Sequence, residues 1–123
     1  MNKFLMAAAL GLAALGFSAA HAHGDAKARH GGVVQLAQDL SFELVAQPGG
    51  AAIYVEDHGQ PLAPTGMSGK LTVLKGSEKT DYPLTPAGDR LEAAGAQLPK
   101  GAKAVALVNG AGKKTITVRF SIK

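Results

Sequence analysis

The 123-residue sequence predicts an all-β sandwich of about seven or eight short strands. Apolar and polar residues alternate in short runs, as in half-buried strands. Glycine or proline stands at most of the breaks between the runs, and no helical periodicity appears after the first 22 residues. Cysteine is absent, so the apolar core must hold this fold together without disulfides or thiolate metal sites.

Residues 1–22 have the three regions of a secretory signal peptide. An early positive charge at Lys3 precedes an apolar run from Phe4 to Phe17, and small residues follow. The apolar run is shorter than the roughly 20 residues that a membrane-spanning helix needs. We therefore expect a cleaved signal peptide and a soluble mature protein in a bacterial periplasm.

Two cleavage points fit the small-residue rule, and both leave a histidine first. Cleavage after Ala22 would expose His23, whose α-amino group and ring nitrogen can chelate one metal ion. Cleavage after Ala20 would expose His21 and place His23 third, an arrangement that gives Cu(II) or Ni(II) a square-planar set of nitrogens. The residues leave the choice between the two open.

The mature chain is expected to be one domain of about 100 residues. Residues 23–31 would be a flexible histidine-containing segment, and residues 32–123 the β-domain. With the signal removed, 12 basic residues face 9 acidic ones, a net charge of +3. The basic residues are scattered and have no interleaved aromatic residues, which argues against nucleic-acid binding.

The strand pattern is clearest in two places. Leu40, Phe42 and Leu44 share one face of a strand, with Ser41 and Glu43 on the other. The last run alternates apolar and polar residues after a glycine-rich turn, which indicates a hairpin with one buried face. A short run at 90–93 is polar enough to suggest an exposed edge. Strands are expected at 33–36, 40–44, 52–56, 70–75, 80–84, 90–93, 102–108 and 113–123.

Histidines near the amino end suggest a metal site. His30 follows His23 closely, with Asp25 between them, and short His-rich tracts are a recognised metal-binding composition. His58 lies where a strand enters a turn, and Asp57 beside it could bind the metal or orient a ring. His58 and Asp57 are also common turn residues, so a purely structural role stays open.

Met67 is the only methionine left after signal removal, and its thioether suits Cu(I), although a single exposed methionine is more often incidental. No nucleophile elbow, phosphate-binding loop or paired histidine motif of a metalloprotease is present in the sequence. We therefore expect a protein that is not an enzyme.

Four segments of the chain carry a resemblance to known proteins: residues 30–34, 54–62, 69–74 and 101–106. Through them the chain resembles the small periplasmic proteins that accompany bacterial heavy-metal efflux systems, and the extra β-domain of some metal-efflux periplasmic adaptor subunits. The resemblance covers most of the mature chain and implies an immunoglobulin-like sandwich that handles copper, zinc or cobalt. A weaker similarity, to periplasmic copper-resistance binding proteins, transfers only His23.

These observations favour a periplasmic heavy-metal-binding accessory protein without enzymatic activity. Copper is the expected ion, with zinc or cobalt as alternatives, and a periplasmic subunit of an efflux pump is a candidate partner. The alternative is an interaction module whose edge strand docks on such a complex, with incidental histidines. The expected ligands are His23, His30 and His58, helped by Asp25 or Asp57.

Overall fold

The structure is a computed structural model that describes residues 27–112 and 114–123. These residues contain strands and no helix, so the all-β prediction is confirmed. No helix long and apolar enough to cross a membrane occurs in them. The strands are β1 (Val33–Ala37), β2 (Leu40–Gln47), β3 (Gly50–Asp57), β4 (Gln60–Pro61), β5 (Ser68–Lys75), β6 (Glu78–Ala87), β7 (Arg90–Ala94), β8 (Lys103–Asn109) and β9 (Ile116–Ser121).

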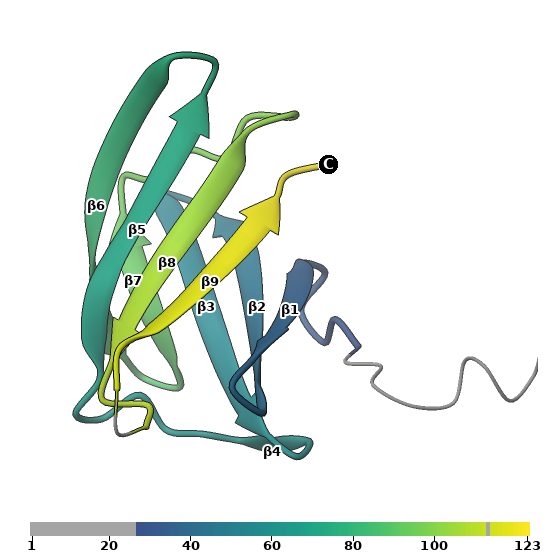
Figure 1. The fold of residues 1–123 in the computed structure, drawn as a ribbon, viewed down its shortest axis with the longest axis vertical. Helices are drawn as coiled ribbons and strands as arrows, with labels where there is room; N and C mark the ends of the chain where they lie inside the picture. The colour runs from purple at the N-terminus through teal and green to yellow at the C-terminus, as the bar shows by residue number, and fades with distance from the viewer. Residues whose placement is uncertain (1–26, 113) are drawn as a thin grey trace, which may run out of the picture.

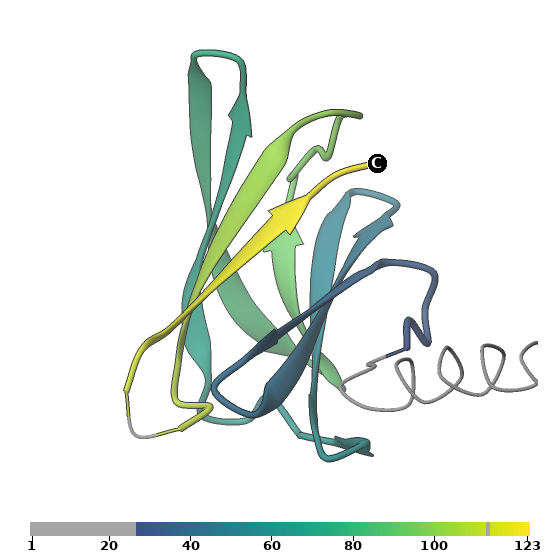
Figure 2. The ribbon, with the colours of Figure 1, turned by 45° about the vertical axis from the view of Figure 1, so that its right-hand side comes forward.

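The strands form one antiparallel, barrel-like sheet. Their order is β1-β2-β3-β7-β6-β5-β8-β9, and the short β4 pairs with the end of β3. Strand β6 pairs with two neighbouring strands: residues 78–84 pair with β5, and residues 85–87 pair with β7. Strand β1 lies against β9, so the sheet nearly closes on itself (Figures 1 and 2).

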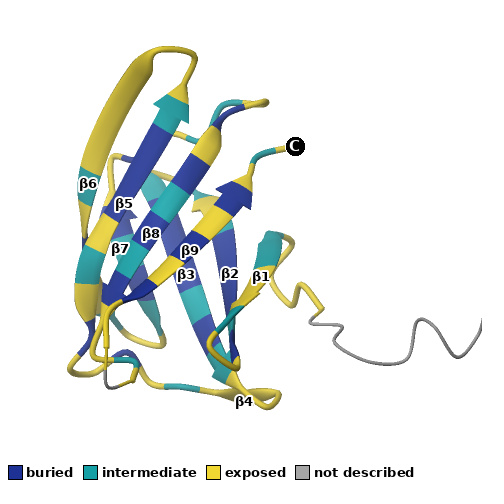
Figure 3. Ribbon diagram, viewed as in Figure 1, coloured by how far each residue is buried: buried dark blue, intermediate teal, exposed yellow. Residues whose placement is uncertain are grey.

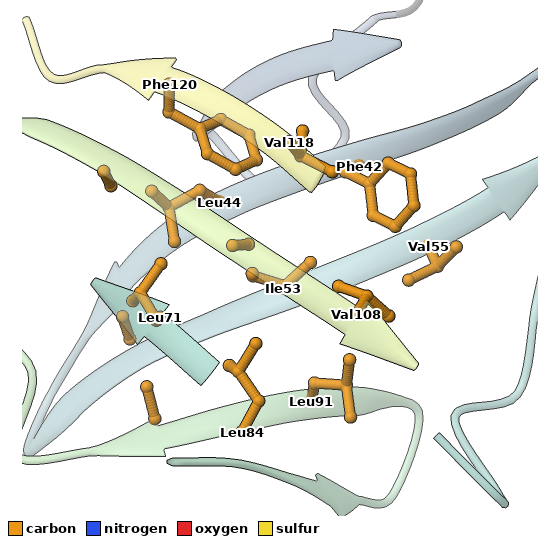
Figure 4. Packing of buried hydrophobic residues seen from close by; sticks show 14 of the residues in the cluster. Phe42, Leu44, Ile53, Val55, Leu71, Leu84, Leu91, Val108, Val118 and Phe120 are labelled. Carbon is orange, nitrogen blue, oxygen red and sulfur yellow. The ribbon is translucent and has the colours of Figure 1, made fainter. Parts of the chain in front are cut away.

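The core lies inside this curved sheet, where the apolar faces of the strands meet (Figure 3). Phe42 and Leu44 of β2 pack with Ile53 of β3, Leu91 of β7 and Phe120 of β9 (Figure 4). Phe42 and Ile53 have no exposed surface. Burial of each such side chain stabilises the fold by about 1.5–3 kcal/mol relative to exposure.

Strand β7 corrects one expectation, the exposed edge at 90–93. It lies between β3 and β6, and Leu91 and Ala93 are fully buried. The polar residues Arg90 and Glu92 alternate with them and point to the outside of the sheet. The alternating polar residues lie on the solvent-facing side of an internal strand, and they do not indicate a free edge.

Met67 also differs from expectation. Its side chain is 4% exposed and belongs to the core, next to the start of β5. Its backbone N–H donates to the carbonyl of Pro64 at 2.8 Å. The idea of an accessible thioether ligand for Cu(I) is therefore wrong for this structure, because binding would require unpacking the core.

Candidate functional site

The segment just before β1, Arg29–Gly32, docks on the outer face of β2 and β3 and is called the arm below. Its main anchor is the carboxylate of Glu43 on β2. The backbone N–H groups of Arg29, His30 and Gly32 donate to Glu43 at 3.1, 2.8 and 2.8 Å respectively. Covered in this way, Glu43 is only 5% exposed although it is on the outer face of its strand.

Strand register and glycine explain why the arm fits there. Glu43 lies between Val34 of β1 and Tyr54 of β3, its direct cross-strand partners. Gly32 passes so close to β2 that an added Cβ would lie 2.2 Å from the carbonyl oxygen of Leu44. Only glycine allows this approach, so the docking of the arm depends on this residue type.

The ring of His30 is fixed on two sides. Its Nδ1 lies 3.0 Å from Oε1 of Glu43, and the ring stacks on Tyr54 with centroids 3.6 Å apart and 7° between the planes. An ionised carboxylate only accepts hydrogen bonds, so Nδ1 carries the proton in the neutral ring and Nε2 carries the free lone pair. The side chain of His30 is 37% exposed, which leaves it partly open to solvent.

The charge on Glu43 follows from two opposing effects. Burial alone would raise the pKa of Glu43, but the hydrogen bonds from the His30 ring and from the backbone of Gly32, His30 and Arg29 outweigh it. The pKa therefore falls below the ordinary value of 4.5. At neutral pH Glu43 is an anion, as the arrangement of four donors around it requires.

A second contact ties the arm to β3. Nε of Arg29 lies 2.7 Å from Oε2 of Glu56. The Arg29 side chain is 56% exposed, so water screens this ion pair, and pairs of this kind contribute about 0–1 kcal/mol. Glu43 is therefore the dominant anchor of the arm.

His58 forms a second carboxylate–imidazole pair. It is the first residue of the two-residue turn between β3 and β4, and both His58 and Gly59 have positive φ. Its Nδ1 lies 2.6 Å from Oδ1 of Asp57. The side chains of His58 and Asp57 are 84% and 51% exposed, so this pair projects into solvent.

An open cleft of about 860 Å³ lies beside the arm. Residues 27–29 line one part of it, and the β1–β2 and β3–β4 turns line others. His58, Glu56 and Asp39 face this cleft together with Leu36, which is 53% exposed. The cleft thus combines charged groups of both signs with an exposed apolar side chain.

The structure describes three of the five expected ligand residues, namely His30, Asp57 and His58. His23 and Asp25 lie outside the described residues. Within 27–112 and 114–123, no three His, Cys, Asp or Glu side chains are grouped so that they could hold a metal ion. His30 and His58 each have a carboxylate partner of their own, Glu43 and Asp57.

Glu43 and Tyr54 were not among the residues expected at the site. The alternation in β2 correctly put Glu43 on the outer face, but nothing in the sequence showed that the arm would cover it. Comparisons with family models, curated proteins and solved structures found no match to this chain.

Proposed function

We propose that this protein is a periplasmic heavy-metal-binding accessory protein, with copper as the favoured ion and zinc or cobalt as alternatives. One observation carries the proposal: His30 and His58 are both held through Nδ1 by carboxylates, which leaves Nε2 of each ring free to bind. Metal-binding histidines in proteins almost always have such a partner on the second ring nitrogen, because it fixes the tautomer and raises the basicity of the ligand.

His30 is the better prepared of the two ligands. Its carboxylate partner is buried and fixed by several donors, and Tyr54 supports the ring from one face. The other ligands are proposed to come from the amino-terminal end, from the amine and ring of His23 with help from Asp25. An extended chain of seven residues spans at most about 25 Å, so His23 is within reach of His30.

The exported location and the immunoglobulin-like sandwich belong to this proposal too. The sequence of residues 1–22 supports export. Strands β5, β8 and β9 face β1, β2, β3 and β7 across the core (Figure 1), an arrangement compatible with a sandwich whose two layers share β6.

The alternative, a docking module that pairs through an edge strand, has weaker support. Residues 78–84 of β6 pair with β5 on one side, and no other described strand pairs with their second side. That edge carries Lys79, Asp81 and Pro83, all of which are exposed. Charges and proline on an edge oppose pairing with another strand.

The deciding experiment is native mass spectrometry of the exported mature protein with one equivalent of Cu(II) or Zn(II). We expect a chain that begins at His23 or His21 and retains one ion. The triple variant His23→Ala, His30→Ala, His58→Ala should lose the ion while its thermal unfolding stays near that of the wild type. Unchanged metal retention in the triple variant would refute histidine ligation. A wild-type chain that takes up no metal would leave the docking module as the better account.

A further inference from the structure

We infer that Glu43 is a positioning residue that orients His30 to bind metal through Nε2 before any ion arrives. The part of this inference that concerns metal affinity rests on the proposed function. The part that concerns the tautomer of His30 and the docking of the arm stands without it.

The geometry excludes Glu43 as a direct ligand. An ionised carboxylate offers about four lone-pair sites. Three backbone N–H groups of the arm and Nδ1–H of His30 donate to it at 2.8 to 3.1 Å. A metal ion could bind Glu43 only by displacing one of these donors from a buried anion. Glu43 therefore acts on the metal through His30.

The same four bonds couple the ring to the backbone that carries it. Because Glu43 holds both the N–H and the ring of His30, the backbone and the side chain of this residue are fixed by one group. Tyr54 limits rotation of the ring from one face. A ligand fixed in this way loses little conformational entropy when it binds an ion.

Asp57 provides the matched comparison within the same molecule. It contacts its histidine at a similar distance, 2.6 Å, but it is exposed and adjacent in the chain. Water can replace Asp57 as the partner of His58 at little cost. Loss of Asp57 should therefore have a much smaller effect than loss of Glu43.

The first test uses the unmodified, metal-free protein. Long-range ¹H–¹⁵N spectra of the histidine rings at neutral pH should show His30 as the Nδ1–H tautomer. The Nε2–H tautomer at His30 would overturn the inference, whether or not the protein binds metal. In the Zn(II)-loaded protein the same spectra should show Nε2 of His30 as the coordinated atom, and coordination through Nδ1 would equally overturn it.

The second test replaces the anion with its neutral isostere. In Glu43→Gln an NH₂ group takes the place of one acceptor oxygen, so the side chain cannot accept all four donors. We expect Zn(II) affinity to fall about 10–100-fold, as is typical when such an orienting partner is removed. The amides of Arg29, His30 and Gly32 should also lose protection from hydrogen exchange.

Two comparisons make this second test decisive. Asp57→Asn should lower Zn(II) affinity less than Glu43→Gln does, because the exposed Asp57–His58 pair couples weakly. Equal losses in Glu43→Gln and Asp57→Asn, or full affinity in a folded Glu43→Gln, would contradict the positioning role. If the wild type binds none of Cu(II), Zn(II) and Co(II), the proposed function fails, whereas the tautomer of His30 and the amide protection still test the role of Glu43. The tautomer does so even if Glu43→Gln does not fold, because it is measured on the wild type.

Discussion

The imidazole of His30 stacks on the phenol ring of Tyr54 with 3.6 Å between centroids and 7° between planes. The two residues are far apart in the sequence, and Glu43 brings them together because it is paired with Tyr54 across β2 and β3 and also binds His30. The arm, Glu43 and Tyr54 thus form one unit on the outer face of the sheet.

Stability should depend on pH through Glu43. Its pKa is lowered in the folded state, so the unfolded chain binds more protons between the folded pKa and the ordinary value of 4.5. The contribution of Glu43 is therefore fully present above about pH 4.5 and is lost as the pH falls through the folded pKa. Urea unfolding at a series of pH values from 7 to 3 measures this. Glu43→Gln should show a weaker pH dependence, and identical profiles for the two proteins would contradict the prediction.

Gly32→Ala should destabilise the docked arm. The new Cβ would meet the carbonyl oxygen of Leu44 at 2.2 Å, and backbone shifts of the kind needed cost about 1–3 kcal/mol. Gly31→Ala is the control, because its Cβ would meet nothing within 4 Å although φ is +77°. Hydrogen exchange of the arm amides should increase more in Gly32→Ala. Equal effects of the two variants would show that positive φ, not close approach, limits the arm.

Phe42→Ala should reduce the free energy of unfolding by about 3–5 kcal/mol, because Phe42 is completely buried in the core. Leu36→Ala removes an apolar side chain that is 53% exposed, and should change stability by no more than about 0.5 kcal/mol. Denaturant unfolding followed by circular dichroism measures both. A small loss in Phe42→Ala would mean that the strands do not pack as described.

Metal binding should weaken as the pH falls from 7.5 to 5, because protons compete with the ion for the same imidazole nitrogens. Isothermal titration with Zn(II) at the two pH values measures the change. His58→Gln should lower affinity less than His30→Gln, since Glu43 and Tyr54 hold His30 while His58 is 84% exposed. Affinity that is independent of pH would count against histidine ligands.

The sequence was sufficient for most strand positions. The alternation of Leu40, Phe42 and Leu44, and of the last strand, has a period of two, which only a strand with one buried face explains. The same reasoning placed Glu43 on the outer face. It failed at 90–93, since polar residues on one face of a strand do not tell whether its backbone edges are free or paired. It also failed at Met67, which was expected to be exposed in a flexible segment but lies in the core.

By itself, the sequence determined the all-β class, the approximate strands and the residue types available as ligands, because these depend on local periodicity and composition. Only the tertiary structure decided that Glu43 is covered and that His30 rests on Tyr54. The physical reason is that strand register and the close approach at Gly32 bring together groups from separate segments. Burial and hydrogen bonding then give Glu43 a role that no pattern along the chain reveals.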